Sequence, residues 1–185
     1  MDGNDTDRAA FEESLLVLRC QLGSEPAFEE LFRRHHGPLS YYLRRLLGET
    51  GRAEDVLQNV WLTVLRKIST LREARAFRTW LYRIARNRAI VELRRRGVEV
   101  PLEGSAAEAE PTAEPTGFPH HDPAAVHRAL GRVSTAHREV ITLRYLNELS
   151  YEEIAEVTGS SIGTVRSRLH YAKRALKKRM EEDNG

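Results

Sequence analysis

The chain has 185 residues, which suits one medium-sized domain or two small ones. Hydrophobic residues make up 41% of it and charged residues 30%, a balance that excludes an intrinsically disordered chain. No stretch reaches the roughly 18 apolar residues of a membrane span, and the acidic start lacks the order of a signal peptide. The single cysteine, Cys20, excludes an internal disulfide and favours the reducing cytoplasm.

The net charge is only +2, but the positive charges are clustered. Between residues 66 and 96, eleven arginines and lysines face only Glu73 and Glu92. Between residues 161 and 179 there are seven basic residues and no acidic one. Solvated helix faces usually mix both signs. The two patches therefore predict two contacts with a polyanion.

The sequence predicts an all-α fold of two small helical domains, because apolar residues recur at helical spacing without the alternation of strands. Residues 1–23 are expected to form an acidic N-terminal tail, 24–96 the first domain and 97–123 a linker. Residues 124–180 are expected to form the second domain, followed by a C-terminal tail, 181–185. The linker is expected to be flexible, because it holds five prolines and only acidic charges.

The first domain is expected to hold four helices. Ser24 caps the first helix, and Gly48 and Gly51 end the second. The third begins near Arg52, and residues 69–76 after it are expected to form a loop. The apolar residues of the third helix predict one buried stripe: Val56, Leu57, Val60, Trp61, Val64, Leu65 and Ile68.

The fourth helix interleaves aromatic residues with arginines. This combination suits single-stranded nucleic acid, whose bases stack and whose phosphates need neutralising. Phe77 and Trp80 are better explained as core residues. Tyr82 and the arginines are the residues expected to be exposed.

The second domain carries the pattern of a helix-turn-helix. Residues 150–153 form a capping box that opens a short helix, residues 158–160 a turn with glycine, and a basic helix follows from Ile162. With Val165 inward, the last helix has several hydrogen-bond donors on its outer face and flanks. Donors of these types read base edges and phosphates in a major groove. These donors are Thr164, Arg166, Ser167, Arg168, His170, Tyr171 and Arg174. A helical hairpin with a solvated basic face is the alternative.

Catalytic motifs are not found in the sequence. It has no glycine-rich phosphate loop, no nucleophile motif and no His-Glu pair at metalloprotease spacing. The pairs at 35–36 and 120–121 are not expected to hold a metal, because adjacent side chains on a helix point about 100° apart. We therefore predict no catalytic residue, no cofactor and no metal.

Four motifs follow one another in a characteristic order. They are EDVLQNVW (54–61), FRTWLYRIARN (77–87), SYEEIA (150–155) and GTVRSRL (163–169). In this order they resemble the extracytoplasmic function (ECF) sigma factors of the sigma-70 family, which are specificity subunits of RNA polymerase and not enzymes. The resemblance spans both domains.

The resemblance implies a role for each surface. It makes residues 24–96 sigma region 2, which binds core polymerase and the −10 element, and residues 124–180 sigma region 4, whose last helix reads the −35 element. The residues implied to dock on the clamp coiled coil of the polymerase β′ subunit are Asp55, Gln58 and Asn59. Those implied to bind and melt the −10 element are Thr70, Arg72, Arg75, Arg83, Arg86, Asn87 and Arg88.

The resemblance also implies partners: core RNA polymerase, including its β subunit, promoter DNA and an anti-sigma factor. It implies a cytoplasmic protein with no membrane insertion of its own. The sequence departs from the family pattern at Val133-Ser134, where Leu-Pro is common, and at Tyr171, where arginine is common. The second departure leaves the exact −35 sequence open.

Two other functions are alternatives to this one. A stand-alone helix-turn-helix regulator explains the second domain, but it does not explain the polar face of the third helix or the first basic patch. Such regulators usually dimerise to read two half-sites. A nucleic-acid-modifying enzyme would need an acid–base or metal set that the sequence lacks.

Overall fold

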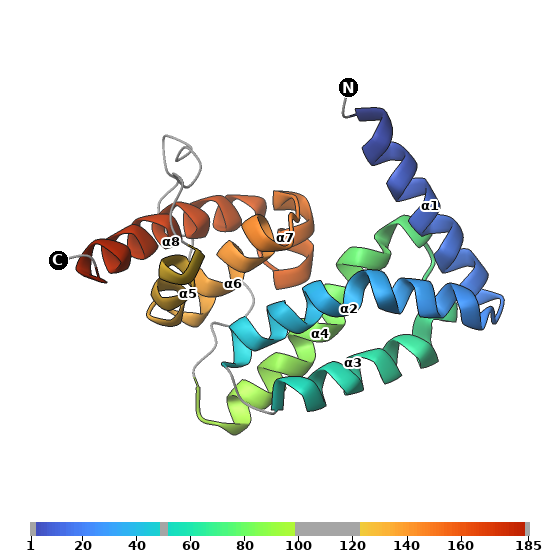
Figure 1. Ribbon diagram of the computed structural model, residues 1–185, viewed down its shortest axis with the longest axis horizontal. Coiled ribbons are helices and arrows are strands. Elements are labelled where there is room, and N and C mark those ends of the chain that lie inside the picture. The colour runs from blue at the N-terminus through green and yellow to red at the C-terminus, as the bar shows by residue number, and fades with distance from the viewer. Residues whose placement is uncertain (1–2, 49–51, 99–122, 184–185) are drawn as a thin grey trace.

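A computed structural model of the chain describes residues 3–48, 52–98 and 123–183, and these ranges contain helices and no strand. The first domain holds α1 (Gly3–Gln21), α2 (Glu25–Leu47), α3 (Arg52–Lys67) and α4 (Phe77–Arg95). The second holds α5 (Pro123–Gly131), α6 (Thr135–Ile141), α7 (Tyr151–Thr158) and α8 (Ile162–Asp183). Figure 1 shows the two groups side by side, which confirms the predicted all-α fold in two helical groups. The expected linker lies almost entirely outside the described residues.

The N-terminal segment differs from the expected tail, since α1 belongs to the first domain. Its Val17 and Cys20 are buried, and the carboxylate of Glu13 accepts a hydrogen bond from His35 Nε2 of α2 at 2.9 Å. Gln21 Nε2 donates to the carbonyl oxygens of Ile68 and Leu71 at 3.0 and 2.7 Å. An acidic composition suggested a tail, but the helical spacing of the apolar residues decides the fold.

Helix α2 is continuous where two segments were expected. It passes through Gly37 and Pro38, although a proline inside a helix removes one backbone hydrogen bond. Leu39, Tyr42 and Leu43 follow directly and are fully buried. Packing after the proline therefore outweighs the lost bond.

Two short 3-10 turns, η1 (Ile68–Thr70) and η2 (Ala74–Ala76), occupy the loop expected between α3 and α4. In the second domain, a π-helical segment, η3 (Thr142–Leu146), follows α6. Together with α1, the two turns close one end of the first domain, because α1 packs against both.

The predicted helix-turn-helix is formed by α7 and α8. The N–H of Ser150 donates to Glu153 Oε2 at 2.7 Å, and the N–H of Glu153 donates to Ser150 Oγ at 3.1 Å. This reciprocal pair confirms the capping box. Gly159 ends α7 with a φ of 66°, a left-handed conformation that glycine adopts at little cost. The turn then directs α8 across α7.

Candidate functional site

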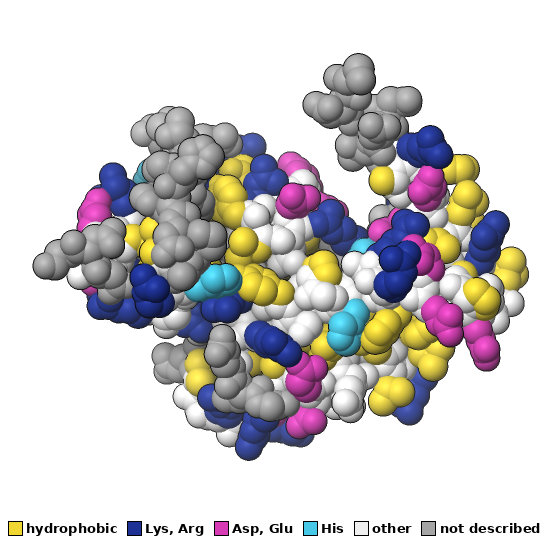
Figure 2. All heavy atoms as spheres, viewed as in Figure 1, with side chains coloured by type: hydrophobic (Ala, Val, Ile, Leu, Met, Phe, Trp, Pro, Cys, Tyr) yellow, Lys and Arg dark blue, Asp and Glu magenta, His cyan; other side chains and the backbone are white. Residues whose placement is uncertain are grey.

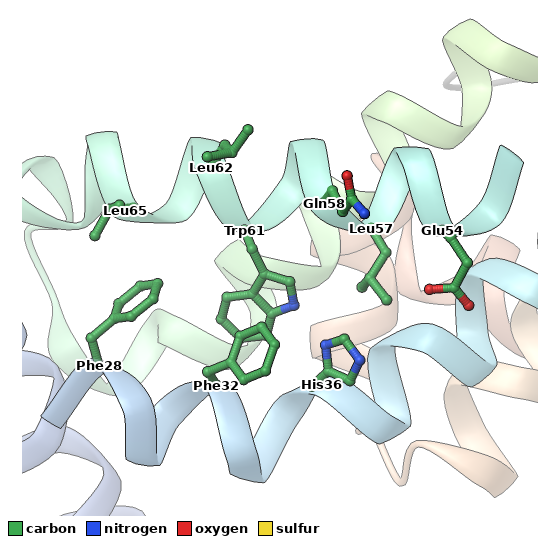
Figure 3. Close-up of a pocket in the computed structure, with 9 residues that line it drawn as sticks. All are labelled: Phe28, Phe32, His36, Glu54, Leu57, Gln58, Trp61, Leu62 and Leu65. Atoms are coloured by element: carbon green, nitrogen blue, oxygen red, sulfur yellow. The ribbon is translucent and has the colours of Figure 1, made fainter. Parts of the chain in front are cut away.

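A groove with a volume of about 480 Å³ runs between α2 and α3. Its walls are largely apolar. Phe32 of α2 is 38% exposed, and Leu62 and Leu65 of α3 are 49% and 57% exposed. Figure 3 shows the lining residues: Phe28, Phe32, His36, Glu54, Leu57, Gln58, Trp61, Leu62 and Leu65. An apolar groove with exposed leucines on its rim is typical of a site for a partner helix.

Leu65 was predicted to be buried, and that prediction is wrong. The other residues of the predicted stripe on α3 are buried. Leu65 follows the same helical spacing as they do, but no described helix covers it. Sequence periodicity shows which side of a helix is apolar, not whether the chain itself or a partner covers it.

Two polar atoms at this groove lack a hydrogen-bond partner within the described part of the chain. They are Trp61 Nε1 and His36 Nδ1, which are both buried. Figure 3 shows the two side chains facing each other from α3 and α2. An indole N–H can only donate, and leaving it unpaired costs about 1–3 kcal/mol. The groove therefore favours an occupant that carries apolar side chains and a hydrogen-bond acceptor.

The three polar residues predicted to dock on a partner are exposed on α3. They do not all share one hollow. Gln58 lines the α2/α3 groove, whereas Asp55 and Asn59 line a second groove between α3 and α4, together with Arg88. Asn59 Nδ2 donates to the Asp55 carbonyl at 2.8 Å, which fixes its side chain along the helix. The exposed side of α3 is thus a polar ridge between two grooves.

The residues predicted to contact the −10 element point in different directions. Thr70, Arg72 and Arg75 are exposed beside η1 and η2, and Thr70 Oγ1 donates to the Lys67 carbonyl at 2.7 Å. Arg83 and Asn87 share an exposed side of α4. Arg88 turns toward α3, where its guanidinium lies 3.4 Å from Thr63 Oγ1.

Arg86 is buried, contrary to the expectation that the arginines of this helix face solvent. Its side chain is 5% exposed, and its Nε lies 2.9 Å from Oε1 of Glu139 on α6, whose side chain is 4% exposed. The hydroxyl of Tyr42 donates to the same carboxylate oxygen at 3.0 Å. The second domain packs on α4 and supplies the carboxylate, a contact that local sequence pattern does not reveal.

Tyr82 was also expected to be exposed, and it is 2% exposed. Asn147, from the second domain, donates through Nδ2 to the Tyr82 hydroxyl at 2.7 Å and to the Pro38 carbonyl at 3.2 Å. The guanidinium of Arg78 donates to the Asn147 carbonyl. Burial raises the pKa of the Tyr82 phenol well above its usual value. The prediction of Phe77 as a core residue is confirmed.

Helix α8 exposes fewer hydrogen-bond donors than its sequence predicts. Arg166 and Arg174 are exposed. Ser167 was predicted to be one of the outward donors, and that prediction is wrong. It is 1% exposed, and its hydroxyl donates to the Thr164 carbonyl at 3.1 Å. The Nδ1 atom of His170 is buried without a hydrogen-bond partner among the described residues. The remaining predicted donors are half-buried: Thr164, Arg168, His170 and Tyr171.

Metal-binding clusters of three or more suitable side chains do not occur in the described residues. Of the histidine pairs considered above, His35 bonds Glu13 and His36 lines the α2/α3 groove. The pair at 120–121 lies outside the described residues. In the same part of the chain, no helix combines the length and the apolar character needed to cross a membrane.

Comparison with known proteins adds independent information. Residues 31–98 match the family model of sigma-70 region 2, and residues 124–176 match that of sigma-70 region 4. The chain is 31% identical to the RNA polymerase sigma-H factor of Pseudomonas aeruginosa, covering 92% of this chain and 94% of the relative. It is 34% identical to the ECF RNA polymerase sigma-E factor of Haemophilus influenzae, covering 91% and 95%.

The fold is similar to a solved sigma factor, RpoE in complex with the anti-sigma factor NepR from Bartonella quintana. The TM-score is 0.66 at 23% identity, over 84% of this chain and 98% of that one. At this identity the likeness supports the fold alone.

Proposed function

This chain belongs to the sigma-70 family and is an RNA polymerase sigma factor of the ECF type, and on that premise we propose how its surfaces divide the work of initiation. The α2/α3 groove and the polar ridge beside it bind the clamp coiled coil of the polymerase β′ subunit. The groove offers apolar side chains and the Trp61 N–H, which has no partner among the described residues, and the ridge offers Asp55, Gln58 and Asn59. A helical hairpin can supply apolar side chains to fill the groove and an acceptor for the Trp61 N–H.

We propose that the −10 element is held by the exposed part of the predicted set. Thr70, Arg72 and Arg75 flank one end of α4, and Arg83 and Asn87 are exposed along it, with Arg83 lying 3.8 Å from Glu156 of the second domain. Cations beside a short loop suit a freed strand, whose phosphates need neutralising and whose bases need a pocket. Arg86 can join this surface only when the second domain leaves α4.

We propose that α8 binds the −35 element through its exposed arginines. Arg166 and Arg174 are the candidates for contacts with base edges, and the half-buried donors around them for contacts with phosphates. Ser167 has no role in this proposal, because its side chain is buried.

We infer further partners from the same premise. The chain works in the cytoplasm with core polymerase, touches its β subunit as well as β′, and catalyses no reaction of its own. An anti-sigma factor holds it inactive. A related fold has been solved with such a protein bound, and the α2/α3 groove is an apolar surface that an inhibitor would cover.

The observation that carries the docking proposal is the exposed apolar rim of the α2/α3 groove. It can be tested by titrating tagged core polymerase with the full chain and with the variant Leu65→Glu. Leu146, which is 43% exposed and lies outside the groove, provides the matched control Leu146→Glu. We expect Leu65→Glu to weaken binding at least roughly tenfold, the equivalent of about 1.4 kcal/mol, while the control binds normally. Equal affinities of the two variants would contradict the proposal.

A further inference from the structure

Helix α1 carries a second apolar stripe, opposite the side that packs on the first domain. Val17 and Cys20 face the core and are buried. At 100° per residue, the second stripe lies roughly opposite to them. Its residues are Phe11, Leu15, Leu18 and Leu22, which are 57%, 40%, 48% and 88% exposed. Leu22 follows the last residue of α1 and keeps the helical hydrogen-bond pattern, since its N–H donates to the Leu18 carbonyl at 3.2 Å.

This stripe is the main apolar patch outside the α2/α3 groove in the described ranges, with four of the ten exposed large hydrophobic residues. Figure 2 shows hydrophobic side chains along α1, and Figure 1 shows its N-terminal half projecting from the rest of the domain. A helix that is apolar on two sides is typically covered on both. A contiguous exposed apolar patch marks an interaction surface.

The spacing of the stripe is the one that helices use to pack on each other. The four residues are separated by four, three and four positions, which is the a/d seam of a coiled coil. This spacing reads the same in both directions along the helix. We propose that α1 is a self-association surface, on which a second copy of the chain packs its own α1 antiparallel across a twofold axis. Phe11 then meets Leu22 of the second copy, and Leu15 meets Leu18.

The charges beside the seam favour the antiparallel direction. Glu12 and Arg19 occupy the e positions, which face each other in an antiparallel pair, so Glu12 of each copy lies near Arg19 of the other. In a parallel pair, g and e positions meet, and Asp7 would lie against Glu12 of the second copy. The antiparallel dimer thus gains two attractive pairs where the parallel dimer has two repulsive ones.

The size of the seam sets the strength of the association. Three turns of a helix pair bury less than the roughly 1,200 Å² at which stable interfaces begin. The dimer is therefore weak and concentration-dependent, with a dissociation constant in the micromolar range or above. It uses no residue of the α2/α3 groove, so this inference goes beyond the proposed function and can fail without it.

Sedimentation velocity of the full chain, over a hundredfold range of concentration, tests the proposal. We expect the sedimentation coefficient to rise from monomer to dimer, Leu18→Glu to abolish the rise, and Leu146→Glu to preserve it. A chain that stays monomeric throughout overturns the proposal, as does a dimer that survives Leu18→Glu. If the chain stays monomeric and Leu18→Glu lowers its affinity for core polymerase instead, the occupant is polymerase and the self-association proposal is wrong.

Cysteine cross-linking tests the direction. In a Cys20→Ala background, we expect the variant Leu15→Cys to form a disulfide with the variant Leu18→Cys when the two are mixed and oxidised. Tags of different length distinguish this mixed product from Leu15→Cys or Leu18→Cys joined to itself. Predominance of the self-joined products would show a parallel pair and overturn the antiparallel arrangement.

Discussion

The Nε atom of Arg86 lies 2.9 Å from Oε1 of Glu139, and both side chains are almost fully buried where the second domain meets α4. Arg86 belongs to the helix proposed to hold the −10 strand, and Glu139 belongs to the domain proposed to read the −35 element. In this arrangement the second domain covers a cation of the first domain. The two domains must therefore separate before Arg86 can reach DNA.

Breaking this ion pair is expected to open the molecule. Replacing one partner of a buried pair leaves the other uncompensated, at a cost of about 3–5 kcal/mol. Glu139→Gln should increase the radius of gyration in solution scattering and strengthen binding of single-stranded −10 DNA by the free chain. The control is Glu182→Gln, because Glu182 pairs with Arg179 at 2.9 Å on the exposed surface of the second domain, where such pairs contribute little. Unchanged scattering from Glu139→Gln would show that the pair does not hold the domains together.

Trp61→Phe is expected to weaken binding to core polymerase without lowering the stability of the fold. The substitution keeps most of the buried ring and removes an N–H that has no partner in the described structure. The free energy of unfolding should therefore stay the same or rise slightly. Binding to core polymerase should weaken if β′ supplies the acceptor for this N–H. An unfolding measurement and a binding titration on the same preparation check both parts, and a loss of stability with normal binding would contradict them.

The contact between α1 and α2 is expected to weaken in acid. Burial opposes ionisation of Glu13, but the hydrogen bond from His35 and the nearby positive charges, including Arg78 and Arg34, together outweigh it, so the pKa of Glu13 lies below its usual value. The ionised carboxylate thus stabilises the fold fully above the unfolded-state pKa, and this contribution disappears as the pH falls through the lower folded-state pKa. The thermal midpoints of wild type and Glu13→Gln should differ at neutral pH and converge in acid. A difference that persists in acid would argue against this ion pair.

Arg174→Ala is expected to change promoter choice. If Arg174 contacts a base edge, the substitution should cost about 1–3 kcal/mol and relax the preference at one position of the −35 element. Lys177→Ala serves as the control, because Lys177 is exposed and lies near Glu181, with 3.8 Å between Nζ and Oε1. Holoenzyme binding to a set of single-base promoter variants measures both effects. No change in affinity or preference with Arg174→Ala would remove it from the −35 surface.

Local pattern was enough to predict several elements. The capping box at Ser150, the buried stripe of α3 apart from Leu65, and the exposure of Gln58 all depend on neighbours within a few turns, and the structure places them as expected. Arg86 and Tyr82 were misplaced because residues far along the chain bury them. The residue pattern of a single helix does not show which distant residues will pack on it.

Leu65 and the second stripe of α1 show a related limit. An apolar residue at core spacing can be covered by the chain itself or by another molecule, and the sequence pattern is the same in both cases. Only the packed structure shows that these side chains are exposed. The sequence thus predicted the polar ridge beside the α2/α3 groove, but it assigned Leu65, on the apolar rim of that groove, to the core.

Run-off transcription with purified core polymerase is the most direct test that this chain acts as a sigma factor. Core polymerase alone should give no specific start, and adding the chain should give a transcript from a promoter that carries its −35 and −10 elements. Leu65→Glu should abolish that transcript, whereas Leu146→Glu should preserve it. The sigma-factor assignment would be contradicted if the chain bound that promoter tightly on its own and core polymerase produced the same transcripts with and without it, as expected of a stand-alone regulator.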